Sequence, residues 1–149
     1  MSHVSNLVLE ILDLDVLKTA CNQMGLTFVE NQKTYAWYGT YLADSDVGRS
    51  TVTSGFNPED FGKCEHAITV PGSSYEIGVV RNPSGNGYRL IYDEYGQGQS
   101  IAKHCGGTDL PRIKQSYAEA RATKHVVRQG YRVTRRVLAN GRVEIKAFK

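Results

Sequence analysis

The chain has 149 residues, of which 40% are hydrophobic and 22% are charged, an ordinary globular composition with enough length for one domain and a substantial core. Its apolar stretches are too short to cross a bilayer, and the first residues carry neither a basic nor an apolar region, so we expect no membrane span and no signal peptide. Three cysteines are a sparse and odd set, which argues against a disulfide framework and for a cytoplasmic protein.

The net charge of +3 conceals a strong asymmetry along the chain. Residues 110–149 contain eleven Lys or Arg against two acids, a net charge of +9. Residues 1–109 contain seven against thirteen, a net charge of −6. A basic segment on an acidic body is a place where an anion, a nucleic acid or an acidic partner can dock.

The first part of the chain predicts a strand, a helix and two further strands. Residues 4–11 alternate loosely between apolar and polar side chains, as a strand does. Asp13 can cap the following helix, and Gly25 can end it in the left-handed conformation. We expect the next two strands at residues 26–30 and 34–41.

The middle of the chain predicts loops and a meander of strands. Residues 42–62 are rich in Gly, Ser, Asn and Asp, and they predict a long, mobile loop. Three further strands are expected at residues 64–70, 75–81 and 88–92. Residues 82–87 predict the hairpin turn between the last two, since they lack the lysine and the helix of a phosphate-binding loop. Residues 96–100 predict a second flexible loop.

A long helix and a hairpin are expected at the end of the chain. Thr108 or Asp109 can cap the helix, with Pro111 in its first turn and Gly130 at its end. Its apolar stripe at helical spacing consists of Ile113, Tyr117, Ala120 and Val127. Strands at residues 131–138 and 142–148 then form a terminal hairpin around the Asn140-Gly141 turn.

These elements predict a single α+β domain over residues 1–149. The expected architecture is one largely antiparallel sheet with two helices packed on one face, the second helix long, and a C-terminal β-hairpin.

The candidate site is a group of basic side chains around the end of the long helix. Lys124 and Arg128 are four residues apart on one helix face, so they repel each other unless an anion lies between them. Arg132 and Arg136 share one face of the following strand, and all four side chains can therefore converge near one end of the helix. The alternative is a solvated basic face that the acidic part of the chain neutralises.

Two tyrosines, Tyr92 and Tyr95, are candidates to stack on a nucleotide base beside this basic group. The alternative is that they are half-buried sheet residues, since a Tyr ring packs while its hydroxyl remains in water. The predicted ligand-binding set is Lys124, Arg128, Arg132, Arg136, Tyr92 and Tyr95.

Cysteine and histidine side chains offer two further interpretations, which their spacing disfavours. Cys64, His66, His104 and Cys105 include the ligand types of a zinc site, and a Cys–His pair is also the minimum of a nucleophilic centre. Cys64 and His66 are two residues apart on a predicted strand, so they share a face without forming a chelating turn. No motif around them supports catalysis, and we expect no enzymatic activity, no metal and no organic cofactor.

Several stretches together resemble one known family: Met1-Ser2-His3, Cys64-Glu65-His66-Ala67-Ile68, Tyr75-Glu76-Ile77-Gly78-Val79-Val80, Tyr92-Asp93-Glu94-Tyr95-Gly96, and residues 117–130 followed by Tyr131-Arg132-Val133. This is the hypothetical chloroplast reading frame thirty-five family, a domain-of-unknown-function family of plastids, cyanobacteria, other bacteria and phages. The resemblance implies no activity. Bacterial members often sit beside a small partner protein and an AAA-class ATPase, which implies an accessory role, and phage members imply a protein that binds a host molecule.

The leading hypothesis for function is non-catalytic binding of an anionic ligand. This ligand is a nucleic acid or a small nucleotide, such as a host signalling nucleotide that a phage protein sequesters, with Arg and Lys on its phosphates and Tyr on its base. The alternative is a protein-interaction adaptor or accessory subunit for an AAA-class ATPase, with the basic helix on an acidic partner. A homo-oligomer is compatible with both hypotheses, and no membrane partner is expected.

Overall fold

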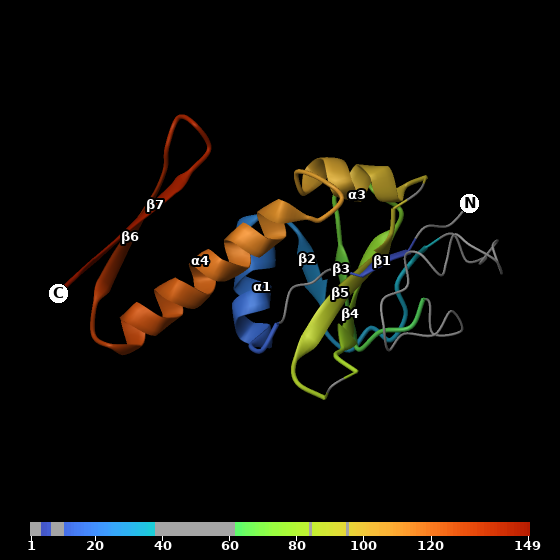
Figure 1. The fold of residues 1–149 in the computed structure, drawn as a ribbon, viewed down its shortest axis with the longest axis horizontal. Coiled ribbons are helices and arrows are strands. Elements are labelled where there is room, and N and C mark those ends of the chain that lie inside the picture. Colours follow the sequence, from blue (N-terminus) through green and yellow to red (C-terminus); the bar gives the residue numbers. More distant parts are fainter. Residues whose placement is uncertain (1–3, 7–10, 38–61, 84, 95) are drawn as a thin grey trace.

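The computed structural model of the chain describes residues 4–6, 11–37, 62–83, 85–94 and 96–149. The elements in chain order are β1 (Val4–Asn6), α1 (Leu14–Gln23), β2 (Thr27–Val29), β3 (His66–Thr69), β4 (Glu76–Arg81), β5 (Tyr88–Asp93), α3 (Gly98–His104), α4 (Pro111–Arg128), β6 (Arg132–Val137) and β7 (Val143–Phe148). Figure 1 shows α4 extending away from the sheet, with the β6–β7 hairpin at its far end.

The main sheet has five strands in the order β1-β5-β4-β3-β2, and every neighbouring pair is antiparallel. The hairpin predicted around residues 82–87 joins β4 to β5, and Arg81 lies opposite Tyr88. β6 and β7 form a separate two-stranded antiparallel sheet. The α+β class, the antiparallel sheet and the C-terminal hairpin are therefore confirmed.

One face of the sheet carries the main hydrophobic core. The alternation of side chains along β4 and β5 directs Ile77, Val79, Leu90 and Tyr92 to this face, and all four are 0% exposed. Helices cover the face with the buried side chains Val16, Leu17, Ala20, Cys21, Ile101, Ile113, Tyr117 and Ala120. Burying such an apolar side chain contributes about 1.5–3 kcal/mol. The sequence predicts two helices on this face, and the structure adds a third, α3.

The opposite face carries a smaller cluster, which consists of Tyr35, Cys64, Ala67, Val80 and Ile91. Gly78 of β4 lies against the Tyr35 ring, and a Cβ at this glycine would be 2.5 Å from the ring Cδ1 atom. The glycine in the middle of a strand therefore allows an aromatic ring to pack directly on the sheet.

The structure describes only residues 34–37 of the strand predicted at residues 34–41. These four residues, Tyr35 among them, do not form a strand. Thr34 forms one isolated bridge, with Lys63. The N–H of Ala36 donates to Oε1 of Glu76 at 2.9 Å, and its carbonyl accepts the Glu76 N–H at 2.9 Å, so one residue at the start of β4 holds both backbone groups. The loop predicted at residues 42–62 lies outside the described residues except for Gly62.

The ends of α1 follow the local sequence. Asp13 is the N-cap, and its Oδ1 accepts the N–H groups of Asp15 and Val16 at 3.0 and 3.3 Å. Gly25 follows the helix with a φ of +74°, which only glycine adopts without strain. Both predictions are confirmed.

α3 occupies most of the segment predicted to be a flexible loop. The prediction rests on the two glycines among residues 96–100, but Gly98 has a packing role. A Cβ at Gly98 would lie 1.6 Å from the carbonyl oxygen of Asp93. The glycine therefore lets α3 start against the end of β5 and place Ile101 in the core.

α4 begins differently from the prediction. Its N-cap is Leu110, which has a φ of +49° and offers no side-chain hydrogen bond, rather than Thr108 or Asp109. The first free N–H of the helix, that of Arg112, instead donates to the carbonyl of Cys105 at 3.0 Å, and the Leu110 side chain is fully buried. Of the described helices, none is long and apolar enough to cross a membrane.

The predicted apolar stripe of α4 is buried only along the first part of the helix. Ile113, Tyr117 and Ala120 are at most 6% exposed, whereas Val127 is 52% exposed. The hairpin that follows turns through three residues, since Leu138 donates its N–H to the Arg142 carbonyl at 2.7 Å. Gly141 occupies the left-handed position of this turn with a φ of +83°.

Candidate functional site

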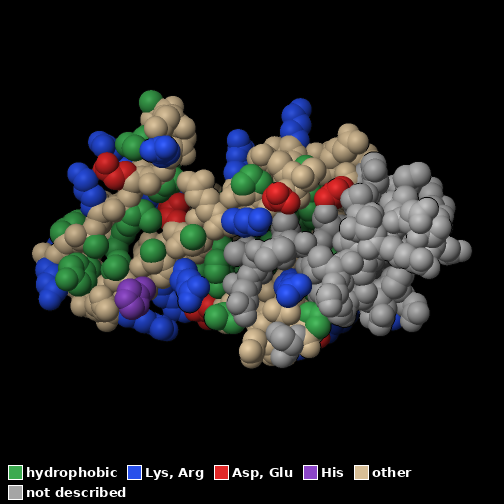
Figure 2. Space-filling model, viewed as in Figure 1, with side chains coloured by type: hydrophobic (Ala, Val, Ile, Leu, Met, Phe, Trp, Pro, Cys, Tyr) green, Lys and Arg blue, Asp and Glu red, His purple; other side chains and the backbone are tan. Residues whose placement is uncertain are grey.

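The basic residues predicted as a site lie in one region, residues 121–149, which we name the arm. It comprises the second part of α4 and the β6–β7 hairpin, and none of its residues is buried. It contains nine Lys or Arg and one acid, Glu144, so its net charge is +8. Figure 2 shows these Lys and Arg side chains at the left of the molecule, over the part that projects in Figure 1. We name the described residues 4–120 the body.

Lys124 forms an ion pair with a residue of the body. Its Nζ lies 2.7 Å from Oδ2 of Asp13, the residue that caps α1. About two turns earlier on α4, the Tyr117 hydroxyl accepts the N–H groups of Leu12 and Asp13 at 3.2 and 3.3 Å. The hydrogen bond from Lys124 is the main cause that lowers the pKa of Asp13. A carboxylate of the chain itself therefore neutralises Lys124, and no ligand is needed to hold it near Arg128.

Two carboxylates, Glu119 and Glu144, form ion pairs with side chains of the hairpin. Arg135 of β6 donates its Nε–H to Oε1 of Glu119, an α4 side chain that is 6% exposed, and this pair fixes the hairpin to the helix. Arg136 lies 3.3 Å from Oε1 of Glu144, the residue opposite it on β7. Lys146 lies 3.7 Å from the same carboxylate oxygen. Arg136 therefore lies in the predicted basic group, but Glu144 already neutralises part of its charge and pairs with Lys146 as well.

Arg128 and Arg132 remain as the exposed cations at the junction of helix and hairpin. Neither forms an ion pair with a described acid. Arg128 lies in the last turn of α4, where the helix dipole stabilises a cation. Between them in sequence is Tyr131, which is half-buried, and the Nζ of Lys149 lies 5.3 Å from the centre of its ring.

The two predicted stacking tyrosines do not join this group. Tyr92 is 0% exposed in the main core, and its hydroxyl donates to the carbonyl of Thr108 at 2.7 Å, so neither ring face can receive a base. Burial is the main cause that raises the pKa of this hydroxyl. Tyr95 lies outside the described residues. Two described aromatic residues lie beside the basic side chains: Phe148, which is opposite Arg132 on β7, and Tyr131, which the sequence indicates only by its position between Gly130 and Arg132.

The Cys and His residues considered for zinc or catalysis are separated by the sheet. Cys64 belongs to the smaller cluster on one face, and its thiol donates to the carbonyl of Gln32 at 3.1 Å. Cys105 is in the main core on the other face. Burial raises the pKa of both thiols to about 11, so both are protonated at neutral pH. In the part of the chain that is described, no three His, Cys, Asp or Glu side chains are grouped to hold a metal ion.

The prediction that Cys64 and His66 share one face of a strand is wrong, because β3 begins only at His66 and Cys64 lies before it. Its ring packs 5.3 Å from the Phe28 ring and 5.9 Å from the Tyr88 ring. Its Nδ1 accepts the N–H of Asn31 at 2.9 Å, a role that needs the neutral ring. Burial lowers the pKa of this imidazole, and the histidine is therefore a structural residue of the body.

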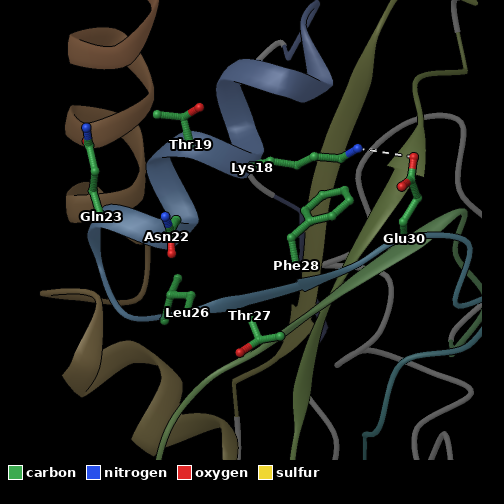
Figure 3. A pocket seen from close by; sticks show the side chains of 8 residues that line it. All are labelled: Lys18, Thr19, Asn22, Gln23, Leu26, Thr27, Phe28 and Glu30. Carbon is green, nitrogen blue, oxygen red and sulfur yellow. Dashed lines mark hydrogen bonds and ion pairs between the residues drawn. The ribbon is translucent and has the colours of Figure 1, made fainter.

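A groove of about 650 Å³ lies between α1 and the edge strand β2 (Figure 3). The Phe28 ring lies beside the Lys18 side chain, with the Lys18 Nζ 5.6 Å from the ring centre. Lys18 also pairs with Glu30 at 3.1 Å across the groove, as the dashed line in Figure 3 shows. The remaining lining residues are uncharged, so the groove carries no net charge for an anion.

A second cavity, of about 420 Å³, is basic and lies in the body. Lys103, His104 and Arg112 line it together with the Pro71-Gly72 turn. Arg112 donates from Nη1 to the carbonyl of His104 at 3.2 Å, at the C-terminal end of α3. Its guanidinium therefore satisfies a helix end, which is a sufficient reason for its place there.

Comparisons with known proteins add no assignment to this geometry. No family model, no curated protein and no solved structure matches the chain.

Proposed function

We propose that this protein binds nucleic acid through the arm, without catalysis. The single observation that carries the proposal is a folded segment of 29 residues, 121–149, with a net charge of +8 and no buried residue. Such a surface gains nothing for the core of its own chain, and its charges repel one another. A phosphate backbone is the partner that would compensate this repulsion, because Lys and Arg would neutralise its charges and its condensed counterions would be released into solution.

The shape of the arm favours an extended polyanion over a small nucleotide. The basic side chains lie on an exposed helix end and an exposed two-stranded ribbon, whereas the two cavities described above lie in the body. A two-stranded ribbon fits the major groove of a duplex. Arg132, Arg136 and Lys146 are on the same face of this ribbon, and Arg128 lies at its base. A small signalling nucleotide, by contrast, needs an enclosed site to be held by its base.

The test is to titrate the protein into a labelled short DNA duplex and, separately, into a labelled single strand, and to measure binding by fluorescence anisotropy. We expect the double change Arg128→Ala, Arg132→Ala to weaken binding by at least about tenfold, since each arginine loses a charged hydrogen bond to phosphate. The slope of log Kd against log salt should fall in magnitude by about 2. The fold should be intact by circular dichroism, because both side chains are exposed.

The matched control removes the same charge from the body. Lys33→Ala combined with Lys103→Ala should leave both the affinity and the salt slope nearly unchanged, although the net charge of the protein falls equally. If the arm and body variants weaken binding equally, the effect is one of net charge and the arm is not the site. Binding of a mononucleotide with the affinity of the duplex would also contradict the proposal.

A protein partner is the second candidate, because the arm exposes large apolar side chains. Val127, Val137 and Phe148 are 52%, 58% and 46% exposed. The family resemblance implies an accessory role beside an AAA-class ATPase, and a basic surface with apolar side chains suits an acidic protein. In a binding assay with an AAA-class ATPase, the double variant Val137→Ser, Phe148→Ser should then bind more weakly than the wild type. The slope of log Kd for DNA against log salt should stay the same in this variant.

A further inference from the structure

The outer edge of β7 is unpaired. β7 has β6 on one side, and no described strand lies on its other side. An isolated two-stranded hairpin is only marginally stable in water, and an unpaired edge is a template for another strand. α4 packs against one face of this hairpin, as the Glu119–Arg135 pair shows, and a face contact leaves the edge of β7 accessible.

The hydrogen bonds of the turn identify the backbone groups on this edge. Leu138 donates its N–H to the carbonyl of Arg142, so this pair is hydrogen-bonded. Hydrogen-bonded and non-hydrogen-bonded pairs alternate along an antiparallel ladder. The backbone groups of Glu144, Lys146 and Phe148 therefore point towards β6, whereas those of Val143, Ile145 and Ala147 point outward from the edge.

Charge then selects one register for pairing with a second copy of this strand. Two identical antiparallel strands pair around a central residue, and three central positions keep most of the strand paired. Centred on Glu144, the register places two glutamates opposite each other, and centred on Lys146 it places two lysines opposite each other. Centred on Ile145, it places Glu144 of each copy opposite Lys146 of the other.

The β6 edge does not offer the same complementarity. Its sequence carries Arg132, Arg135 and Arg136, and registers centred on residues 134, 135 or 136 each place an arginine opposite an arginine. Like charges directly opposite each other are destabilising in a sheet. The β7 edge is therefore the self-complementary one.

We propose that two copies of this protein associate through their β7 edges, in the antiparallel register centred on Ile145. The product is a four-stranded sheet, β6-β7-β7-β6, with a two-fold axis at Ile145. One of its faces carries two Glu144–Lys146 pairs between the copies, and the other carries Ile145 against Ile145 and Val143 against Ala147. The inference does not rest on nucleic-acid binding, but the shared sheet would place Arg132 and Arg136 of both copies on one continuous face.

The test is a mixing experiment followed by sedimentation velocity. Wild-type protein should sediment as a dimer that dissociates on dilution. Glu144→Lys alone places lysine opposite lysine at two points, and Lys146→Glu alone places glutamate opposite glutamate, so each variant should dimerise at least about tenfold more weakly. In an equimolar mixture of the two variants, opposite charges face each other again, and the mixture should form a heterodimer with near wild-type affinity.

A backbone substitution tests the same edge without changing charge. Ala147→Pro removes an N–H that points outward, so it should abolish the dimer while the β6–β7 ladder and the circular dichroism spectrum are kept. Ala147→Val retains the N–H and should leave the dimer intact. Wild-type protein that is monomeric at every concentration, or variants that fail to recover on mixing, would overturn the proposal. A monomer that still binds DNA with the predicted salt slope would overturn this inference alone.

Discussion

The body and the arm of this protein are stabilised by different interactions. In the body, side chains such as Leu17, Ile77 and Leu90 are 0% exposed, and α1, α3 and α4 cover a five-stranded sheet. In the arm no residue is buried, and the ion pairs Lys124–Asp13 and Arg135–Glu119 are among its contacts with the body. Complete burial of apolar side chains therefore stabilises the first region, whereas the second relies more on ion pairs, backbone hydrogen bonds and partly buried side chains.

The change between the two regimes occurs within a single helix. Ile113, Tyr117 and Ala120 of α4 pack in the main core, and one turn later Lys124 replaces apolar packing with an ion pair. The last turn of α4, with the Arg128 side chain, is then exposed to solvent. A rigid helix thus carries the basic ribbon away from the sheet, which keeps its charges accessible at little cost to the core.

The largest effect we expect comes from a glycine of the body. Gly98→Ala would bring a Cβ to 1.6 Å from the Asp93 carbonyl oxygen, so either α3 or the end of β5 must move. We expect a loss of about 4 kcal/mol or more in the free energy of unfolding, or failure to fold. Urea unfolding followed by circular dichroism measures it, and Ser100→Ala in the same helix is the control. A Gly98→Ala protein of wild-type stability would show that α3 does not pack as described.

The second prediction compares two apolar residues on α4. Ile113→Ala removes a side chain that is 1% exposed and should cost about 3 kcal/mol through lost burial and a cavity. Val127→Ala removes one that is 52% exposed and should change stability by less than about 0.5 kcal/mol. Thermal and urea unfolding of both variants measure this difference. Equal losses would mean that the second part of α4 is buried in solution, for example against a second copy.

Local signals in the sequence predict those elements whose cause is local. The Asp13 cap acts on the nearby N–H groups of Asp15 and Val16, and Gly25 and Gly141 adopt the positive φ that a helix end and a tight hairpin need. The α+β class and the antiparallel sheet follow from the spacing of such elements. The concentration of basic residues near the end of the chain can likewise be found from the sequence alone, since charge can be counted along the chain.

The remaining features depend on contacts between distant residues. The glycine at residue 98 looks like a loop residue until Asp93 is placed beside it, and Leu110 starts α4 because Cys105 accepts the N–H of Arg112. The site differs for the same reason. The sequence predicts Tyr92 either as a stacking residue or as a half-buried sheet residue, whereas it is 0% exposed in the main core. Sequence spacing also gives no sign that Lys124 lies beside a carboxylate 111 positions away.

The smallest predicted effect concerns Asp13, the residue that connects the body to the arm. Asp13→Ala removes both the α1 cap and the partner of Lys124, and should cost about 1–2 kcal/mol. Asp13→Asn keeps a good cap and loses only the ion pair, which is a third exposed, so about 0.5 kcal/mol or less is expected.

The pH dependence separates these two roles of Asp13. The pKa of Asp13 in the folded protein is below its ordinary value of 3.8, chiefly because of the hydrogen bond from Lys124. The unfolded chain therefore binds the proton first, so the stabilisation by the ion pair is fully present above pH 3.8 and is lost as the pH falls through the lowered pKa. The stability difference between wild type and Asp13→Asn, from urea unfolding, should shrink from pH 7 to pH 3, whereas Lys124→Met should make the remaining difference small at both. A wild-type to Asp13→Asn difference that is the same at pH 7 and pH 3 would mean that Lys124 does not hold Asp13 in solution.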